Sequence, residues 1–136
     1  MDQTAERNGK TVLVAVNDIF FYAKLRDALR GGEYTLERAR TEEDVAAKAD
    51  TAAALVINMN DDRLDAFRAL EGLKHRSTQS PLPILAFANH EEVDTWRRAK
   101  ELGATKVVSR NEFSARTREL VEEVIAASNQ SSVIGT

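Results

Sequence analysis

Several residue types are absent or scarce in this chain, and each absence excludes a class of function. There is no cysteine among the 136 residues, so disulfides, thiol nucleophiles and thiolate metal sites are excluded. No apolar run approaches the roughly 18 to 20 residues that a membrane-spanning helix needs. Residues 1–10 are polar and contain no apolar signal core. We therefore predict a cytoplasmic chain that does not engage a membrane.

Charge of one sign is not in excess either. The chain has 19 basic and 22 acidic residues, for a net charge of −3, and no block of Lys and Arg. A nucleic-acid partner therefore has no electrostatic support in this sequence. The composition, 43% hydrophobic and 30% charged, is ordinary for a globular protein, and the length suits one domain with a core of its own.

Short apolar runs rich in Val, Ile and Leu alternate with longer segments of helical period. The runs predict strands at 11–16, 34–39, 53–58, 84–88 and 106–109, and the segments between and after them predict helices at 18–30, 42–49, 62–75, 91–102 and 112–127. The strands are apolar at successive positions, as expected when helices cover both faces of a parallel sheet. Residues 10–128 then form one domain, with a disordered segment at 1–9 and a flexible tail at 129–136.

Capping residues and topology rules extend this prediction to a fold. Asp18 and Thr41 stand where helix N-caps are expected, and Gly31 and Gly103 follow helices where a left-handed residue is needed. Five strand–helix units with right-handed crossovers predict an α/β, doubly wound, flavodoxin-like parallel sheet of strand order 2-1-3-4-5. In such a sheet the functional crevice lies beyond the carboxyl ends of the strands. These ends fall at residues 16–20, 58–62, 88–90 and 109–111.

The strand ends carry a resemblance to a known family. Residues 10–127 resemble the receiver domain of two-component response regulators, and the spacing from Asn58 through Leu64-Asp65-Ala66 to Gly103-Ala104 fits that family. The resemblance places the family's two metal-binding acids on Val16 and Asn17 with Asp18 next, its phosphoacceptor aspartate on Asn58, its switch Ser or Thr on Ala88, and its Lys-Pro pair on Arg110 and Asn111. Within the family, the chain is similar to a subset with Phe20-Phe21 early in the first helix and Asn89-His90 after the fourth strand.

These departures remove the chemistry that the resemblance would imply. A carboxamide at Asn58 lacks the charge and the nucleophilic oxygen that form an acyl phosphate. Mg²⁺ prefers carboxylate oxygens, and Asp18 alone is a weak ligand set. Ala88 has no hydroxyl to bond a phosphoryl oxygen. We therefore predict a pseudo-receiver that is not an enzyme and has neither a metal nor another cofactor.

Arg110 is the one strong cation expected at the crevice. If its side chain reaches inward, it would hydrogen-bond Asn58 or Asp18 and hold one conformation permanently. The alternative is a solvent-facing arginine in a loop. We predict the inward position, because the residue follows a strand that is directed at the crevice.

Other polar residues near the strand ends have structural interpretations that we favour. His90 has no second histidine nearby and no acid at ligand spacing, so we expect a helix-cap or crevice-wall residue rather than a proton donor or metal ligand. Asp61 and Asp62 precede a helical segment and are interpreted as N-terminal caps rather than a catalytic carboxylate pair.

Aromatic residues mark two candidate interaction surfaces. Ile19, Phe20, Phe21 and Tyr22 occupy one helical turn, and a helix that packs on a sheet cannot bury all four directions. One or two of them should be exposed, with Phe20 or Tyr22 as anchor, unless loop packing covers them. Trp96 is expected to lean on the sheet edge, or else to mark a dimerisation or docking face.

Three hypotheses from different classes follow. The favoured one is a phosphorylation-independent regulatory module that binds a signalling protein, or a second copy of itself as a homodimer, through a fixed surface. The second is a sensor in which Arg110, Asn17, Asn58 and backbone donors hold a small anionic ligand in the vacated crevice. The third, an enzyme, is weak, because Ser109 has no candidate base and there is no glycine-rich phosphate loop.

Overall fold

The computed structural model describes residues 11–31, 33–75 and 82–134. The segment 1–9, predicted to be disordered, lies outside the described residues. The strands are β1 (Thr11–Ala15), β2 (Thr35–Arg38), β3 (Ala54–Asn58), β4 (Ile84–Ala88) and β5 (Lys106–Ser109). The helices are α1 (Ile19–Ala28), α2 (Glu42–Lys48), the 3₁₀ turn η2 (Ala49–Thr51), α3 (Ala66–Lys74), α4 (Val93–Glu101), α5 (Arg110–Ala115) and α6 (Thr117–Ile134).

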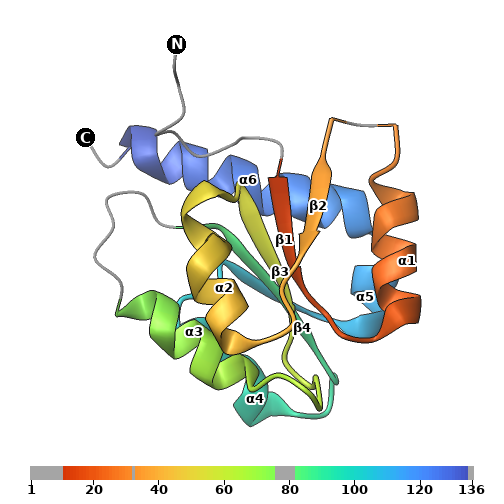
Figure 1. Ribbon diagram of the computed structural model, residues 1–136. Coiled ribbons are helices and arrows are strands. Elements are labelled where there is room, and N and C mark those ends of the chain that lie inside the picture. Colours follow the sequence, from red (N-terminus) through yellow and green to blue (C-terminus); the bar gives the residue numbers. More distant parts are fainter. Residues whose placement is uncertain (1–10, 32, 76–81, 135–136) are drawn as a thin grey trace.

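The strands form one parallel sheet of order β2-β1-β3-β4-β5 (Figure 1). This order and the doubly wound class are as predicted, and each strand lies within one residue of its predicted bounds at either end. In the register, Ala15 lies beside Ile57, Asn58 beside Phe87, and Ala88 beside Ser109. The carboxyl ends of the four strands that carry the predicted site are therefore level with one another.

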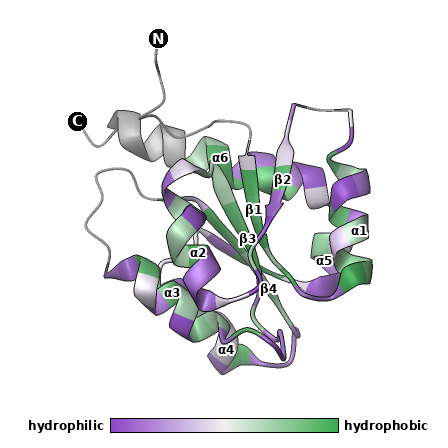
Figure 2. Ribbon diagram, viewed as in Figure 1, coloured by the Kyte–Doolittle hydropathy of each residue, from purple (hydrophilic) through white to green (hydrophobic). Residues whose placement is uncertain are grey.

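Helices cover both faces of the sheet, as the continuous apolar strands predict. On one face the strands pack against α2, α3 and α4, through residues such as Val45, Leu70 and Ala99. On the other they pack against α1, α5 and α6, through residues such as Leu25, Phe113 and Leu120. Every residue of β1, β3 and β4 is buried. Figure 2 shows these hydrophobic strands between helices whose outer surfaces are largely hydrophilic.

An aromatic stack forms the centre of the second core. The ring of Phe87 in β4 contacts two others: its centroid lies 4.4 Å from that of Phe113 of α5 and 5.0 Å from that of Phe21 of α1, and these last two centroids are 6.0 Å apart. Both contacts are stacked arrangements, which add to the free energy of burial alone. The stack joins α1, β4 and α5 directly below the carboxyl ends of the strands.

Local signals for the helix ends are confirmed. The Asp18 carboxylate accepts hydrogen bonds from the backbone N–H groups of Phe20 and Phe21, and the Thr41 hydroxyl accepts one from Asp44. Gly31 and Gly103 adopt φ of 85° and 108°, the left-handed region that glycine enters without strain.

Two helix boundaries differ from the prediction by more than two residues, the start of α3 and the end of the last helix. Helix α3 begins at Ala66 rather than at residue 62, because the Asp61 carboxylate accepts hydrogen bonds from Arg63 and Leu64 and holds residues 61–64 in a turn. The final helix is interrupted at Arg116, whose φ of −132° is not helical, and it continues to Ile134 rather than ending at 127. None of the helices within the described part of the chain is long and apolar enough to cross a bilayer.

Candidate functional site

The predicted crevice positions lie at the carboxyl edge of the sheet, and the loops after β1, β3, β4 and β5 form what we call the crevice. Val16 and Ala88 are buried, and the Asn58 side chain is only 4% exposed. Asn17 and Arg110 are half-buried, while Asp18 and Asn111 are exposed. The structure therefore buries Val16, Asn58 and Ala88 and leaves Asp18 exposed, where it caps α1.

Asp61 occupies the crevice in a way that the sequence did not indicate. Its carboxylate accepts hydrogen bonds from the backbone N–H of Asn17 at 2.8 Å and from the Asn17 side-chain amide at 3.2 Å. It also accepts bonds from the N–H groups of Arg63 and Leu64. The interpretation of Asp61 as a helix cap is wrong, because the cap of α3 is Asp65, whose side chain accepts from Arg68. Asp61 instead joins the loop after β3 to the loop after β1.

A second polar link joins the loop after β3 to the loop after β4. The Asn58 side-chain oxygen accepts a bond from the N–H of Asn60 at 2.9 Å, so the position of the family's phosphoacceptor is occupied internally. The Asn60 side chain accepts from the N–H of Asn89 at 2.8 Å and donates to Glu92 at 2.8 Å. Glu92 also accepts from the Asn89 side chain and from the Thr95 hydroxyl.

The hydrogen bonds to Glu92 favour its charged form. Donation from Asn60, and then from Asn89 and Thr95, lowers the pKa of the Glu92 carboxyl below the ordinary glutamate value. Glu92 stands just before α4, at the N-cap position, but its carboxylate is directed at the neighbouring loop instead of capping the helix. It is therefore ionised at neutral pH, with its oxygens engaged by these donors.

The described residues contain no metal-binding cluster. No group of three or more His, Cys, Asp or Glu side chains that could hold a metal ion is found within 11–31, 33–75 and 82–134. The His90 side chain is largely exposed, and its Nε2 lies 3.9 Å from the neighbouring Glu91 carboxylate. Positions 17 and 58 provide amides rather than carboxylates at this edge of the sheet.

Arg110 does not make the predicted contacts. Its guanidinium carbon lies 4.5 Å from the centroid of the Phe21 ring and 5.8 Å from that of Phe87, a cation–π arrangement. Among the residues that the structure describes, it forms no hydrogen bond or ion pair with Asp18 or Asn58. The predicted pairing is wrong: the guanidinium lies over aromatic rings, a contact that its planar, weakly hydrated cation favours.

The predicted aromatic surfaces differ in their exposure. Phe20 is 82% exposed and Ile19 is 64% exposed, and Figure 2 shows the hydrophobic start of α1 at the molecular surface. Tyr22 is half-buried beneath the Arg38 guanidinium, 4.8 Å away. Trp96 is half-buried against the sheet, as expected, and its indole N–H donates to the carbonyl of Asn89 at 2.9 Å. Phe20 is therefore the better candidate for an anchor residue.

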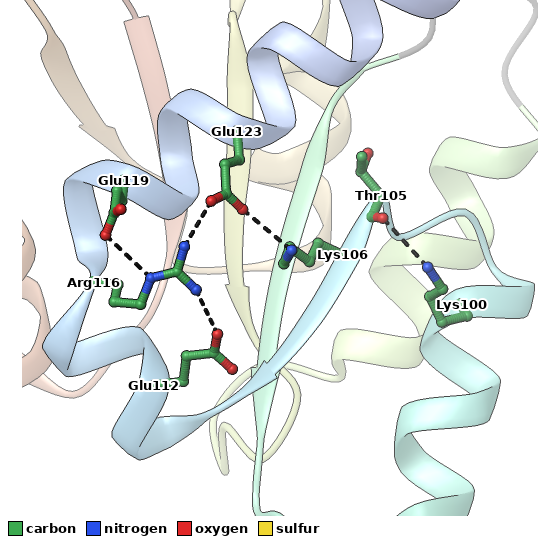
Figure 3. Close-up of polar contacts among 7 residues, drawn as sticks. All are labelled: Lys100, Thr105, Lys106, Glu112, Arg116, Glu119 and Glu123. Atoms are coloured by element: carbon green, nitrogen blue, oxygen red, sulfur yellow. Dashed lines mark hydrogen bonds and ion pairs between the residues drawn. The ribbon is translucent and has the colours of Figure 1, made fainter.

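A group of ion pairs joins the start of β5 to α5 and α6 (Figure 3). Arg116, at the break between α5 and α6, contacts the carboxylates of Glu112 at 2.7 Å, Glu119 at 3.1 Å and Glu123 at 2.6 Å. Glu123 also pairs with Lys106 of β5 at 3.2 Å. The hydrogen bond to Glu119 is the main cause that raises the pKa of Arg116, and that from Lys106 is the main cause that lowers the pKa of Glu123. Each of the three carboxylates is thus paired with a cation within the molecule.

Sequence reasoning missed the roles of Asn60, Asp61 and Glu92. Asn60 and Asp61 directly follow a buried strand and Glu92 precedes a helix, so their positions at the crevice could have been inferred. Their pairing could not, because Asn60 and Glu92 are 32 residues apart and Asn17 and Asp61 are 44 apart. The exposure of Val93, at 69%, was also not foreseen.

Comparisons with known proteins identify the fold. No protein-family model matches the chain, and no curated protein matches its sequence. Solved structures do match: a putative response regulator from Chloroflexus aurantiacus is 19% identical, with a TM-score of 0.75 over 86% of this chain and 98% of that one. The chemotaxis response regulator CheY4 of Vibrio cholerae is 20% identical, with a TM-score of 0.68 over 85% and 98%.

A third match agrees with these two. The receiver domain of NtrX from Brucella abortus is 18% identical, with a TM-score of 0.70 over 85% of this chain and 98% of that one. At such identities the likeness establishes the fold, which is that of response-regulator receiver domains.

Proposed function

We propose that this protein is a pseudo-receiver: a regulatory module of two-component-like signalling that does not accept a phosphoryl group and acts by binding another protein. It is a non-enzymatic module without cofactor, and its partner is a signalling protein or a second copy of itself. The proposal also places it in the cytoplasm, without nucleic-acid or membrane partners.

The observation that carries the proposal is that polar groups of the crevice already have hydrogen-bond partners within the protein. Asn58 stands at the end of β3, where the resemblance places the phosphoacceptor, and its oxygen already accepts a hydrogen bond from Asn60. The amide of Asn17 is bonded to Asp61. A receiver selects between two conformations because the phosphoryl group stabilises one of them. Without a nucleophile or metal ligands, the relative population of the two conformations is determined by the sequence alone.

The start of α1 supports binding through a fixed surface. Ile19 and Phe20 are adjacent, largely exposed and apolar, and exposed aromatic residues are frequent anchors at protein interfaces. Phe21, next to them, is held by the aromatic stack and by Arg110. The patch therefore sits on an ordered part of the structure, which lowers the entropic cost of binding.

A sensor of small anions is the second candidate, and one observation favours it. The half-buried Arg110 has no carboxylate partner among the described residues, so its N–H donors are available to a ligand. Against it, the Asp61 carboxylate occupies the donors of Asn17 and adds negative charge to the crevice. We therefore rank this candidate below the binding module.

Phosphodonors test the chemistry. We expect acetyl phosphate or beryllofluoride with Mg²⁺ to leave the intact mass and the amide NMR spectrum unchanged. A stoichiometric, acid-labile phosphate in the intact mass would contradict the proposal. A thermal-shift screen with small anions tests the sensor, because a ligand at 100 times its dissociation constant adds about 2.7 kcal/mol to the free energy of unfolding.

Surface variants test the binding. We expect Phe20→Ala to reduce self-association or capture of a partner, with an unchanged circular dichroism spectrum, and wild-type binding to be indifferent to Mg²⁺. Lys24→Ala is the matched control, since Lys24 is exposed one turn further along α1. Trp96→Ala tests the other surface. If binding is lost only in Arg110→Ala, together with the response to an anion, the sensor replaces the module.

A further inference from the structure

Three loops of the crevice are joined by hydrogen bonds that involve two carboxylates. Asn17 lies in the loop after β1, Asn60 and Asp61 in the loop after β3, and Asn89 and Glu92 in the loop after β4. Asp61 joins the first loop to the second, and Glu92 and Asn89 join the second to the third. We call these five residues the interloop network.

We propose that the interloop network holds the crevice in one conformation without a metal ion, a phosphoryl group or another ligand, with Asp61 as its main acceptor. This inference rests on the proposed function and deepens it, because it assigns the residues that keep a receiver-like domain in a single state.

The charges of the crevice explain why no cation is required. Acidic side chains that face one another repel, and a bound cation relieves that repulsion. Here Asp18, in the loop after β1, and Asp61, in the loop after β3, are separately engaged by N–H donors. Asp18 accepts two backbone bonds at the start of α1, and Asp61 accepts four, from Asn17, Arg63 and Leu64. Hydrogen bonds to a charged acceptor are stronger than neutral ones.

The two halves of the network are not equal. The bonds between Asn17 and Asp61 are partly buried, whereas those of Glu92 are exposed to solvent. Water competes for exposed hydrogen bonds and screens the charge, so the Asp61 half contributes more. The Glu92 half contacts the first turn of α4, where the Thr95 hydroxyl donates to Glu92 and the Trp96 indole donates to the Asn89 carbonyl.

Amide hydrogen exchange measured by NMR tests the inference. In Asp61→Ala we expect exchange at Asn17, Arg63 and Leu64 to be at least about tenfold faster, because each loses its acceptor. Asp62→Ala is the matched control: Asp62 is adjacent and exposed, and within the described chain its carboxylate has no hydrogen bond, so we expect no change at those amides. Unchanged exchange in Asp61→Ala would overturn the inference.

Two further measurements guard against a variant that fails to fold. Asp61→Asn keeps the shape and one acceptor oxygen, and should give a smaller increase at the same amides. Wild-type protein titrated with millimolar Mg²⁺ should show no slowing of exchange there. Slower exchange with Mg²⁺ would mean that a cation completes the crevice, and would also overturn the inference. The proposed function is tested separately, since a protein with a loose crevice can still be inert to phosphodonors.

Discussion

At the scale of single residues, amides in place of acids change both the chemistry and the contacts of the crevice. Asn58 cannot form an acyl phosphate, and its oxygen is used within its own loop by Asn60. The Asn17 side chain is a donor where an acid would be an acceptor, which allows the Asp61 carboxylate to accept a bond from that amide at 3.2 Å, beside the bond from the Asn17 backbone N–H. The amide at position 17 thus offers a metal no carboxylate and gives the neighbouring Asp61 carboxylate a donor.

Restoring the acid at position 58 should not restore phosphorylation. In Asn58→Asp, the nucleophile is present but Val16 and Asn17 still provide no carboxylate for Mg²⁺. We expect no stable phosphate by intact-mass analysis after treatment with acetyl phosphate and Mg²⁺. The triple variant Val16→Asp, Asn17→Asp, Asn58→Asp is the comparison, and robust phosphorylation of the single variant would show that other groups supply the metal site.

Glu92 should contribute a pH-dependent term to stability. The pKa of Glu92 is lower in the folded protein than that of a free glutamate, because Asn60, Asn89 and Thr95 donate to it. The stabilisation is therefore present above the unfolded pKa and is lost as the pH falls through the folded pKa. As the pH falls from about 5 to about 3, we expect the free energy of unfolding to decrease less in Glu92→Gln than in wild type. Glu91→Gln, changed at the exposed neighbour, should follow the wild-type curve in urea titrations.

At the scale of elements, the end of the chain shows how one side chain can break a helix without disturbing its apolar stripe. Phe113 and Thr117 are both buried, and the Thr117 hydroxyl donates to the carbonyl of Phe113 at 2.6 Å across the break. Arg116 leaves the helical conformation between them and gathers three glutamates from both helices. At the break, Arg116 therefore pairs with one carboxylate of α5 and two of α6.

Removing the Arg116 charge should destabilise the α5–α6 junction. In Arg116→Gln, the carboxylates of Glu112, Glu119 and Glu123 keep their like charges but lose their common cation, with only Lys106 left beside Glu123. We expect a lower midpoint of urea unfolding, and a smaller difference from wild type at high salt, where surface charges are screened. Arg97→Gln, which breaks a single exposed pair with Asp94, should change the midpoint less. An equal effect of the two variants would contradict this account.

At the scale of the whole molecule, the apolar interior of the sheet and its polar carboxyl edge are separate regions. Its interior is continuous apolar packing on both faces, while its carboxyl edge carries the polar interloop network and the exposed start of α1 (Figures 1 and 2). The aromatic stack of Phe21, Phe87 and Phe113 lies between these regions. The surface that we propose for binding is therefore supported by the core rather than by a ligand.

Two phenylalanine variants separate the core from this surface. We expect Phe87→Ala to lower the free energy of unfolding by about 3 to 5 kcal/mol, because it removes a fully buried ring that stacks on two others. Phe20→Ala should stay within about 0.5 kcal/mol of wild type, because its ring is 82% exposed. Both are measured by urea titration. A large loss of stability in Phe20→Ala would mean that this side chain belongs to the core and not to a binding surface.

The sequence by itself determined the fold class, the strand order and the helix caps at Asp18 and Thr41. These features depend on local periodicity and on the functional groups of individual residues, which do not change with the fold. The tertiary structure alone decided that Arg110 stacks on Phe21, and that Asp61 bonds to a residue 44 positions away. Such contacts depend on distances between loops, and a hydrogen bond or cation–π contact forms only when the sheet brings its two groups within a few ångströms.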